Sequence, residues 1–325
     1  PPGAGSGRAP AGNPKKSLGH TFGSVAGKYA LIAELATEHG VAEACDLLEV
    51  SASGFYAWRR REPGPRAQAD RQIGVRIAAI HAASRKTYGY PRVTRALRKE
   101  GVRCSRKRVA RLMRLRGLCG SRKARFRPRT TDSDHDDPIS PNRLRTLAPV
   151  ERPNRVWVTD ITYVPTRDGW SYLAAVMDLG TRNVKGWSLQ DTLKTELVSA
   201  AFRQAVFRYQ PGPGLVVHSD RGCQYASESF RDLLAQQGAL GSMSAKGNCY
   251  DNAAMESFWA TLKNELNVEE PFQTQEEARQ VIFEYIEVFY NRQRLHSSIG
   301  YQSPLDYETQ LMRENAVPRL SEISG

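Results

Sequence analysis

Between residues 155 and 266, short β-rich runs and helical patterns follow one another in an order that strongly restricts the fold. Three runs rich in β-branched and aromatic residues, at 155–165, 169–180 and 183–190, are separated only by short turns, which predicts a three-stranded meander whose first strand ends at Pro165. Helical patterns at 195–209, 228–238 and about 251–266 then alternate with short apolar runs at 214–220 and 240–245. The C-terminal half therefore contains an α/β domain.

The N-terminal part has helical patterns only. Residues 28–62 are typical of a helix-turn-helix-like unit, in which Ser51 caps a second helix that ends in Arg59 and Arg60. Residues 63–128 predict three more helices, with Pro91 in the first turn of the second and Ser105 as the N-cap of the third. A plain helical hairpin with a basic end remains an alternative for 28–62.

The third of these helices is basic outside its apolar stripe. The stripe consists of Val109, Leu112, Met113 and Leu115, which we expect to face a core. The cations on its other faces favour contact with a DNA groove or backbone over a protein partner, and they are Arg106, Lys107, Arg108, Arg111 and Arg114.

Positive charge is confined to one segment of the chain. Residues 59–129 hold 24 Lys and Arg against three acids, a net charge of +21, whereas the other residues hold 23 basic and 31 acidic side chains, a net charge of −8. A basic field of this kind favours a polyanionic partner, because each cation placed near a phosphate releases condensed counterions. The alternative is that the positive charge only keeps the surface of this segment hydrated, but a mixture of acidic and basic side chains would do that equally well.

These features predict a multidomain protein, with an all-α helix-turn-helix-like N-terminal region and an α/β catalytic core. Three antiparallel strands followed by alternating helices and strands is the order of an RNase-H-like domain. The predicted divisions are a leader at 1–27, the helix-turn-helix-like unit at 28–62, the basic helical domain at 63–128, a linker at 129–152, the core at 153–310 and a tail at 311–325.

The remaining composition excludes several classes of protein. No stretch approaches the roughly 20 apolar residues of a membrane span. The five cysteines are scattered without a C-x-x-C pair, which argues against a zinc site or a disulfide framework and favours a reducing, intracellular setting. His135 lies among four aspartates in the linker, but the linker offers no apolar structure to hold a metal site.

Three carboxylates stand in positions that call for an explanation. Asp160 lies in the middle of a strand, where aspartate is depleted and a buried charge needs a cation or a metal. Asp220 ends an apolar strand, at the edge where open α/β sheets commonly bind ligands, although a simple turn residue is equally consistent with this position. Glu256 lies on a helix beside an apolar stripe.

The helix of Glu256 also carries Lys263, about 20° away around the helix and two turns further on. Glu256 and Lys263 are consistent with a loose ion pair on the surface. They are equally consistent with a metal ligand, Glu256, followed by a cation, Lys263, that binds DNA. Three carboxylates on separate elements can hold two divalent ions for phosphoryl transfer, Mg²⁺ with Mn²⁺ as a substitute. Asp178, Asp191 and Asp251 remain competing carboxylates.

At this point the motifs resemble a family. "WVTDITYV", "VVHSDRGCQYAS" and "SAKGNCYDNAAMESFWATLKNEL" are similar to the insertion-sequence transposases of the IS-three family, the second-frame products of the DDE transposase and retroviral-integrase superfamily. Asp160 and Asp220 are 60 residues apart, 35 residues separate Asp220 from Glu256, and a lysine follows seven residues after the glutamate. "FYNRQRLHSSIGYQSPLDY" and "YGYPRVTRAL" extend the resemblance over most of residues 28–310.

The resemblance implies an RNase-H-like integrase core and Mg²⁺-dependent cleavage at the ends of an insertion element, after which the 3′-OH attacks another phosphodiester. It implies that Asp160, Asp220 and Glu256 bind the two metal ions and that Lys263 contacts DNA. It also implies a group that supports the carboxylates or positions nearby DNA, namely His218, Ser219, Arg221, Gln224, Tyr225, Asn248, Asp251 and Asn252.

The expected partners follow from the same resemblance. They are the terminal inverted repeats of the element, target DNA and further copies of the chain on DNA, in the cytoplasm of a bacterium at its nucleoid. Family members usually join a first-frame product that supplies a helix-turn-helix and a leucine zipper, and because no sustained heptad occurs here, this chain resembles the second frame with a short leader. Three other functions compete with this one: a hydrolysis-only nuclease of RNase-H fold, a non-catalytic DNA-binding regulator and a structural assembly protein.

Overall fold

The computed structural model describes residues 24–36, 40–62, 64–121, 138–147, 150, 152–244, 252–268 and 270–316. The chain divides into two compact units, with the boundary between Ile73 and Gly74, inside helix α5 (Pro65–Ala83). Within the described residues, no helix combines the length and the apolar character needed to cross a bilayer.

The first unit is a small three-helix cluster. It contains α2 (Val25–Leu35), α3 (Val41–Leu47) and α4 (Ala52–Arg60). Ser51 caps α4 as its sequence predicts, since its Oγ accepts a hydrogen bond from the Gly54 amide at 2.9 Å. The core of the unit is made of Ile32, Ala44, Cys45, Leu48 and Phe55. Because this core is small, each of the three helices buries only one of its faces and exposes the rest of its surface.

The second unit opens with the basic helices, α5, α6 (Tyr90–Lys99) and α7 (Arg106–Leu115). Pro91 lies in the first turn of α6, and Ser105 Oγ caps α7 by accepting from the Arg108 amide at 3.2 Å. Three members of the predicted stripe of α7 are buried, but Leu115, the last residue of the helix, is 70% exposed.

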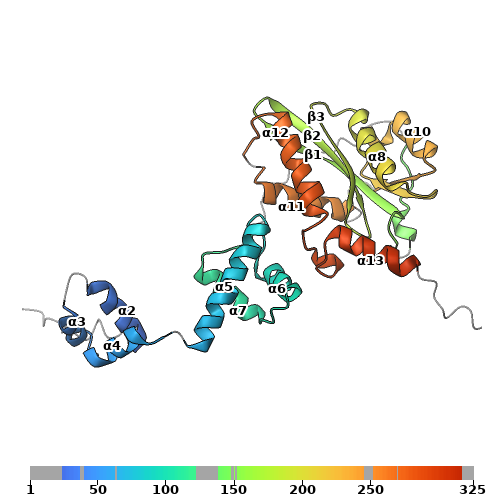
Figure 1. Ribbon diagram of the computed structural model, residues 1–325. Coiled ribbons are helices and arrows are strands. Elements are labelled where there is room, and N and C mark those ends of the chain that lie inside the picture. Colours follow the sequence, from blue (N-terminus) through green and yellow to red (C-terminus); the bar gives the residue numbers. More distant parts are fainter. Residues whose placement is uncertain are drawn as a thin grey trace, which may run out of the picture. The chain divides into compact units, whose positions relative to one another are not determined.

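A five-stranded mixed sheet forms the centre of the core. Its strands are β1 (Val156–Thr166), β2 (Gly169–Asp178), β3 (Val184–Gln190), β4 (Val216–Ser219) and β5 (Leu240–Met243). They lie in the order β3-β2-β1-β4-β5, with β1–β2 and β2–β3 antiparallel and β4 and β5 parallel to β1 (Figure 1). This is the RNase-H-like arrangement that the order of elements predicts.

The expectation that β1 ends at Pro165 is wrong by one residue. Pro165 pairs with Trp170, and the strand continues to Thr166 opposite Gly169. Proline is tolerated because β4 pairs with β1 only at residues 156–158, and on that side Pro165 takes part through its carbonyl oxygen, which accepts from the Phe272 amide at 3.1 Å.

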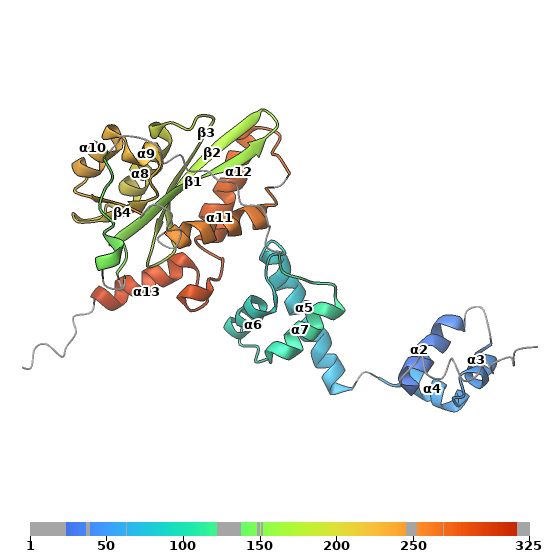
Figure 2. The same ribbon diagram turned by 180° about the vertical axis from the view of Figure 1, so that it is seen from behind.

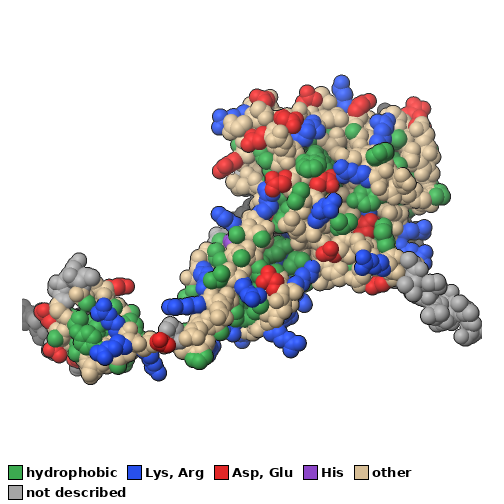
Figure 3. All heavy atoms as spheres, viewed as in Figure 1, with side chains coloured by type: hydrophobic (Ala, Val, Ile, Leu, Met, Phe, Trp, Pro, Cys, Tyr) green, Lys and Arg blue, Asp and Glu red, His purple; other side chains and the backbone are tan. Residues whose placement is uncertain are grey.

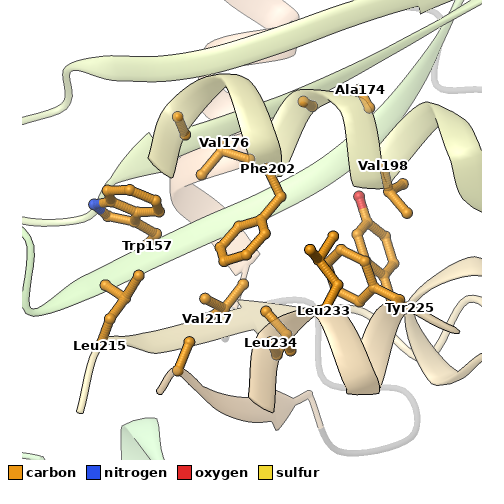
Figure 4. Packing of buried hydrophobic residues seen from close by; sticks show 14 of the residues in the cluster. Trp157, Ala174, Val176, Val198, Phe202, Leu215, Val217, Tyr225, Leu233 and Leu234 are labelled. Carbon is orange, nitrogen blue, oxygen red and sulfur yellow. The ribbon is translucent and has the colours of Figure 1, made fainter. Parts of the chain in front are cut away.

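Helices cover both faces of the sheet (Figures 1 and 2). One face carries α8 (Thr195–Tyr209), α9 (Cys223–Ala226) and α10 (Glu228–Gln236). Their apolar side chains, such as Phe202 of α8, form a hydrophobic core with strand residues that include Trp157, Val176 and Val217 (Figure 4). Gly186 lets α8 lie directly against β3, since a Cβ there would stand 2.3 Å from the Ala201 carbonyl oxygen.

The opposite face carries α11 (Ala253–Leu266) and α12 (Gln275–Phe283), which continues into a π-helical segment, Glu284–Tyr290. Phe258 of α11 packs edge-to-face on Tyr290 with ring centroids 4.8 Å apart, and the Tyr290 hydroxyl reaches Met177 of β2. A 3₁₀ turn (Ser297–Ile299) and α13 (Pro304–Ala316) follow as the last described elements. The helix α13 crosses residue 310, where the sequence places the start of a tail.

A buried polar network joins the sheet to α13. Lys185 of β3 is fully buried and pairs with Glu308 of α13, which also accepts a hydrogen bond from Asn183 at 2.6 Å. Asp178 lies beside them and accepts from the amides of Asn154, Gly180 and Thr181 at 2.6–2.9 Å. Burial lowers the pKa of Lys185, and the charges of Glu308 and Asp178 oppose that shift. Each charge in the network therefore depends on the others.

Replacing Glu308 alone should be far more damaging than replacing the pair. In Glu308→Leu the Lys185 ammonium loses the carboxylate that it pairs with, which should lower the free energy of unfolding by about 3–5 kcal/mol. The double variant Lys185→Met/Glu308→Leu should recover part of that loss, because it removes the buried cation together with its partner, while Asp178 keeps its three backbone amide donors. Urea unfolding followed by circular dichroism measures both, and equal losses in the two variants would contradict this role of the network.

Candidate active site

Asp160 lies on the face of β1 that looks toward α11. Trp157 and Ile161 of the same strand belong to the core under α8, and alternation along the strand turns Asp160 to the opposite side. There its Oδ2 accepts a hydrogen bond from Nε1 of Trp259, at 3.0 Å. The strand thus places a carboxylate between the sheet and the helix that carries Glu256.

Asp220 follows the last residue of β4, next to β1 in the sheet. The parallel register sets His218 opposite Val158, two residues before Asp160. The Asp220 side chain closes a turn, because its Oδ1 accepts from the Gly222 amide at 3.0 Å, and α9 starts directly after it. Parallel pairing of β1 and β4 therefore brings Asp220 to the same part of the sheet as Asp160.

Glu256 occupies the first turn of α11 and is exposed. The buried side chains of Met255, Phe258 and Leu262 hold this helix on the sheet, as the apolar stripe predicts. Lys263 lies on the same helix and is partly buried. Glu256 therefore stands on a rigid element, while its own side chain remains accessible.

The charges of these residues act on one another. Low hydration raises the pKa of Asp160 to about 8, and the nearby negative charges of Asp220 and Glu256 add to this increase, whereas hydrogen bonds from the Ile161 amide and from Trp259 oppose it. Burial lowers the pKa of Lys263, and the charge of Asp160 opposes that change. The strand, the loop after β4 and α11 consequently share one electrostatic site.

The donor set suits a hard divalent cation. Within the described residues, no three or more His, Cys, Asp or Glu side chains stand as a ready-made metal cluster. Asp160, Asp220 and Glu256 supply carboxylate oxygens from three separate elements, and oxygen ligands of this type are those that Mg²⁺ and Mn²⁺ bind.

Two competing carboxylates have other positions. Asp178 is fully buried and is satisfied by three backbone amides in the network described above. Asp191 is exposed in the segment between β3 and α8. Asp251 and Asn248 lie outside the described residues, as do His135 and the four aspartates around it.

Most of the expected supporting residues surround Asp220. His218 is buried between the hydroxyls of Ser242 and Ser244, at 2.9 and 3.1 Å, and so ties β4 to β5. The buried hydroxyl of Tyr225 is 3.1 Å from that of Thr159, and burial, followed by the charges of Asp160 and Asp220, raises its pKa well above the usual value. The other hydrogen bonds run from Ser219 Oγ to the Asp220 carbonyl, from Arg221 to the Ser244 carbonyl and from Gln224 to the Leu193 carbonyl.

Asn252 precedes α11 and is buried, and its Oδ1 has no hydrogen-bond partner among the described residues. It provides no side-chain cap for the helix.

The expected DNA-contacting cations lie on helix surfaces. Arg106, Lys107, Arg111 and Arg114 of α7 are exposed, and Arg108 is partly exposed. Arg59 and Arg60 are exposed in the last turn of α4, in the first unit. In Figure 3, Lys and Arg side chains outnumber acidic ones on the visible surface of the basic helices.

Sequence reasoning missed two residues of α11. Trp259 was not recognised as a partner of Asp160, although a buried indole N–H normally finds an acceptor. Glu265, which is 3% exposed, forms a bidentate ion pair with Arg294 at 2.7–3.1 Å and also accepts from the Tyr285 hydroxyl at 2.9 Å. No sequence pattern indicates the pair, because 29 residues separate its members.

Comparison with known proteins supports the same assignment of fold and function. Residues 150–249 and 237–304 match two family models of an integrase core domain, and residues 67–126 match that of an HTH-like domain.

Three relatives match most of the chain. It is 44% identical to the "Insertion element IS600 uncharacterized 31 kDa protein" of Shigella sonnei, over 80% of this chain and 95% of that protein. It is 41% identical to the "Transposase for insertion sequence element IS904" of Lactococcus lactis, over 74% and 95% of the two chains. It is 38% identical to the "Transposase InsF for insertion sequence IS3A" of Escherichia coli, over 86% and 98%.

Relatives of this identity and coverage, together with the integrase core and the HTH-like domain, define the family. The chain belongs to the IS3 family of insertion-sequence transposases, which makes it a DNA transposase and a polynucleotidyl transferase of the DDE type.

Proposed function

We propose that this transposase cleaves DNA at the ends of its insertion element and joins the 3′-OH to another phosphodiester, with Asp160, Asp220 and Glu256 as ligands of two divalent ions. The observation that carries the proposal is the placement of these carboxylates on β1, at the end of β4 and on α11, where the pairing of β1 with β4 brings Asp220 near Asp160 and a hydrogen bond from Trp259 joins Asp160 to α11. We propose Mg²⁺ as the ion, with Mn²⁺ as a substitute, because both prefer oxygen ligands.

The residues of the chain have distinct tasks in this reaction. The turn closed by Asp220 and the amide of Gly222 holds one carboxylate, and the pairing of β1 with β2 and β4 holds Asp160. Bound ions would activate the attacking oxygen and stabilise the leaving 3′ oxygen. Asp160 must give up its proton before it can act as a ligand. We assign Lys263 to a DNA phosphate beside the site, because it is a partly buried cation on the helix that carries Glu256, seven residues further along.

The basic helices bind the DNA on which the core acts. The exposed cations of α7 fit the sugar-phosphate backbone, and the cations at the end of α4 offer a second contact. We propose that residues 28–62 and 63–128 form these two binding modules, that 129–152 link them to a catalytic core at 153–310 and that 311–325 form a tail. Two element ends must be processed together, so we propose at least two copies of the chain on DNA, acting with the first-frame product of the same element.

Removing any of the three carboxylates should abolish strand transfer. Asp160→Ala, Asp220→Ala and Glu256→Ala should each lower the joining of labelled element ends in Mg²⁺ by at least about 100-fold, because a metal ligand is removed. Asp191→Ala removes an exposed carboxylate outside the site and is the matched control, with activity unchanged. DNA cleavage without joining in the unmodified protein would favour a hydrolytic nuclease, and full activity in the three variants would refute the assignment.

Metal binding should depend on pH through Asp160. A carboxyl whose pKa is raised to about 8 is mostly protonated at neutral pH in the metal-free protein, and a cation must displace that proton. Affinity for Mn²⁺ should therefore rise about tenfold per pH unit below about pH 8 and level off above it. Calorimetry in buffers of different ionisation enthalpy measures the proton release, and an affinity that does not vary between pH 6 and 8 would contradict the prediction.

The cations of α7 should contribute to the salt dependence of DNA binding. Changing Arg106, Lys107 and Arg111 to alanine should reduce the slope of log K against log[salt] by about 0.9 for each phosphate that is no longer neutralised, or by as much as about 3 in total. Arg203→Ala/Arg313→Ala, which changes exposed cations of α8 and α13, is the control and should leave the slope unchanged. Fluorescence anisotropy over a salt series gives both slopes. An unchanged slope in the triple variant would exclude α7 from the DNA interface.

A further inference from the structure

Trp259 connects two elements of the proposed metal site. Its indole projects from α11 and is 7% exposed, and Nε1 donates to Oδ2 of Asp160 on β1 at 3.0 Å. Glu256 lies three residues earlier on the same helix, within one helical turn. A single hydrogen bond therefore links the strand of one proposed ligand to the helix of another.

The hydrogen bond is held rigidly at both ends. The Trp259 ring packs on Phe258 with centroids 4.8 Å apart, and Phe258 itself packs on Tyr290. Asp160 belongs to a strand paired on both sides near this position, and its carboxylate also accepts from the Ile161 amide. Neither partner can turn away without disturbing packed structure.

The chemistry of the carboxylate explains why this donor matters. An ionised carboxylate has about four lone-pair positions, and the indole N–H takes one on Oδ2. A fixed donor at that position holds the plane of the carboxylate and leaves other lone pairs for a cation. Groups that orient metal ligands in this way typically contribute a factor of about 10–100 to metal affinity.

We propose that Trp259 is a positioning residue of the metal site, which orients the Asp160 carboxylate and sets the register of α11, and with it Glu256, against β1 before a cation binds. The proposal rests on the proposed function, since it takes Asp160 and Glu256 as ligands. Trp259 itself touches no substrate and transfers no proton.

The core contains a matched control for this hydrogen bond. Trp187 of β3 is also 7% exposed, and its Nε1 also donates to a carboxylate, that of Glu287, at 3.0 Å. Glu287 also pairs with Arg208 and belongs to no proposed ligand set. Trp187→Phe and Trp259→Phe thus remove the same kind of bond from equally buried indoles, and only the latter is at the proposed site.

The test measures Mn²⁺ binding by electron paramagnetic resonance of the free ion, with strand transfer against Mn²⁺ concentration as a second measurement. In Trp259→Phe we expect Mn²⁺ affinity to fall about 10–100-fold and the half-saturating concentration for strand transfer to rise in parallel. The Mn²⁺ affinity of Trp187→Phe should stay within about twofold of that of the unmodified protein, because this variant keeps every hydrogen bond that orients a proposed metal ligand. Affinity in Trp259→Phe that equals that of Trp187→Phe, or exceeds that of the unmodified protein, would overturn the proposal.

Two further variants complete the design. Benzothienylalanine at position 259 replaces only the N–H of the indole by sulfur, so it should reproduce the loss of affinity even if Trp259→Phe fails to fold, and unchanged affinity with this residue would also overturn the proposal. Asp160→Asn tests the underlying function. If Asp160→Asn keeps full Mn²⁺ affinity, the metal site itself is refuted, whereas its loss of affinity beside unchanged binding in the position-259 variants refutes only the role of Trp259.

Discussion

The burial of Asp160 near two further carboxylates is the constraint that the core must accommodate. Asp160 stands between sheet and helix, where burial and, after it, the charges of Asp220 and Glu256 raise its pKa. Such an arrangement lowers the stability of the cation-free protein, so the surrounding structure has to hold it in place. The sheet does so through β1, which pairs with β2 along its whole length and with β4 beside Asp160, while α11 is held by its buried apolar face.

The C-terminal end of α11 is secured in a different way. Glu265 forms a bidentate ion pair with Arg294, both almost fully buried, and accepts a hydrogen bond from Tyr285. The residue after Arg294, Leu295, is bound by the basic helical part of the same unit: its amide donates to the Tyr88 hydroxyl at 2.7 Å, and its carbonyl accepts from Arg92 at 2.9 Å. A continuous set of hydrogen bonds thus runs from the segment around α6 to the helix of Glu256.

Much of this molecule could be predicted from sequence. The strands and most helices were expected near their observed positions, because each has a strong period and clear end signals such as Ser51, Pro91 and Ser105. The helices α12 and α13 were not expected, and neither were the short elements: α9 has four residues, and the 3₁₀ turn Leu144–Thr146 lies in the expected linker, where Arg143 bonds to Ser242 and Gly241 of β5. Elements of this length carry no periodicity and form only because their neighbours supply the hydrogen bonds.

The amino-acid sequence by itself determined most secondary-structure elements and the position of the basic segment. The sequence motifs around Asp160, Asp220 and Glu256 also determined the family. These are local properties, written in spacing and residue type. Only the tertiary structure separated Asp178 from the candidate ligands, by surrounding it with backbone amides, and only it joined Trp259 to Asp160 and Glu265 to Arg294. Hydrogen bonds and ion pairs between residues 29 to 99 positions apart leave no local pattern, because they exist only once the chain has packed.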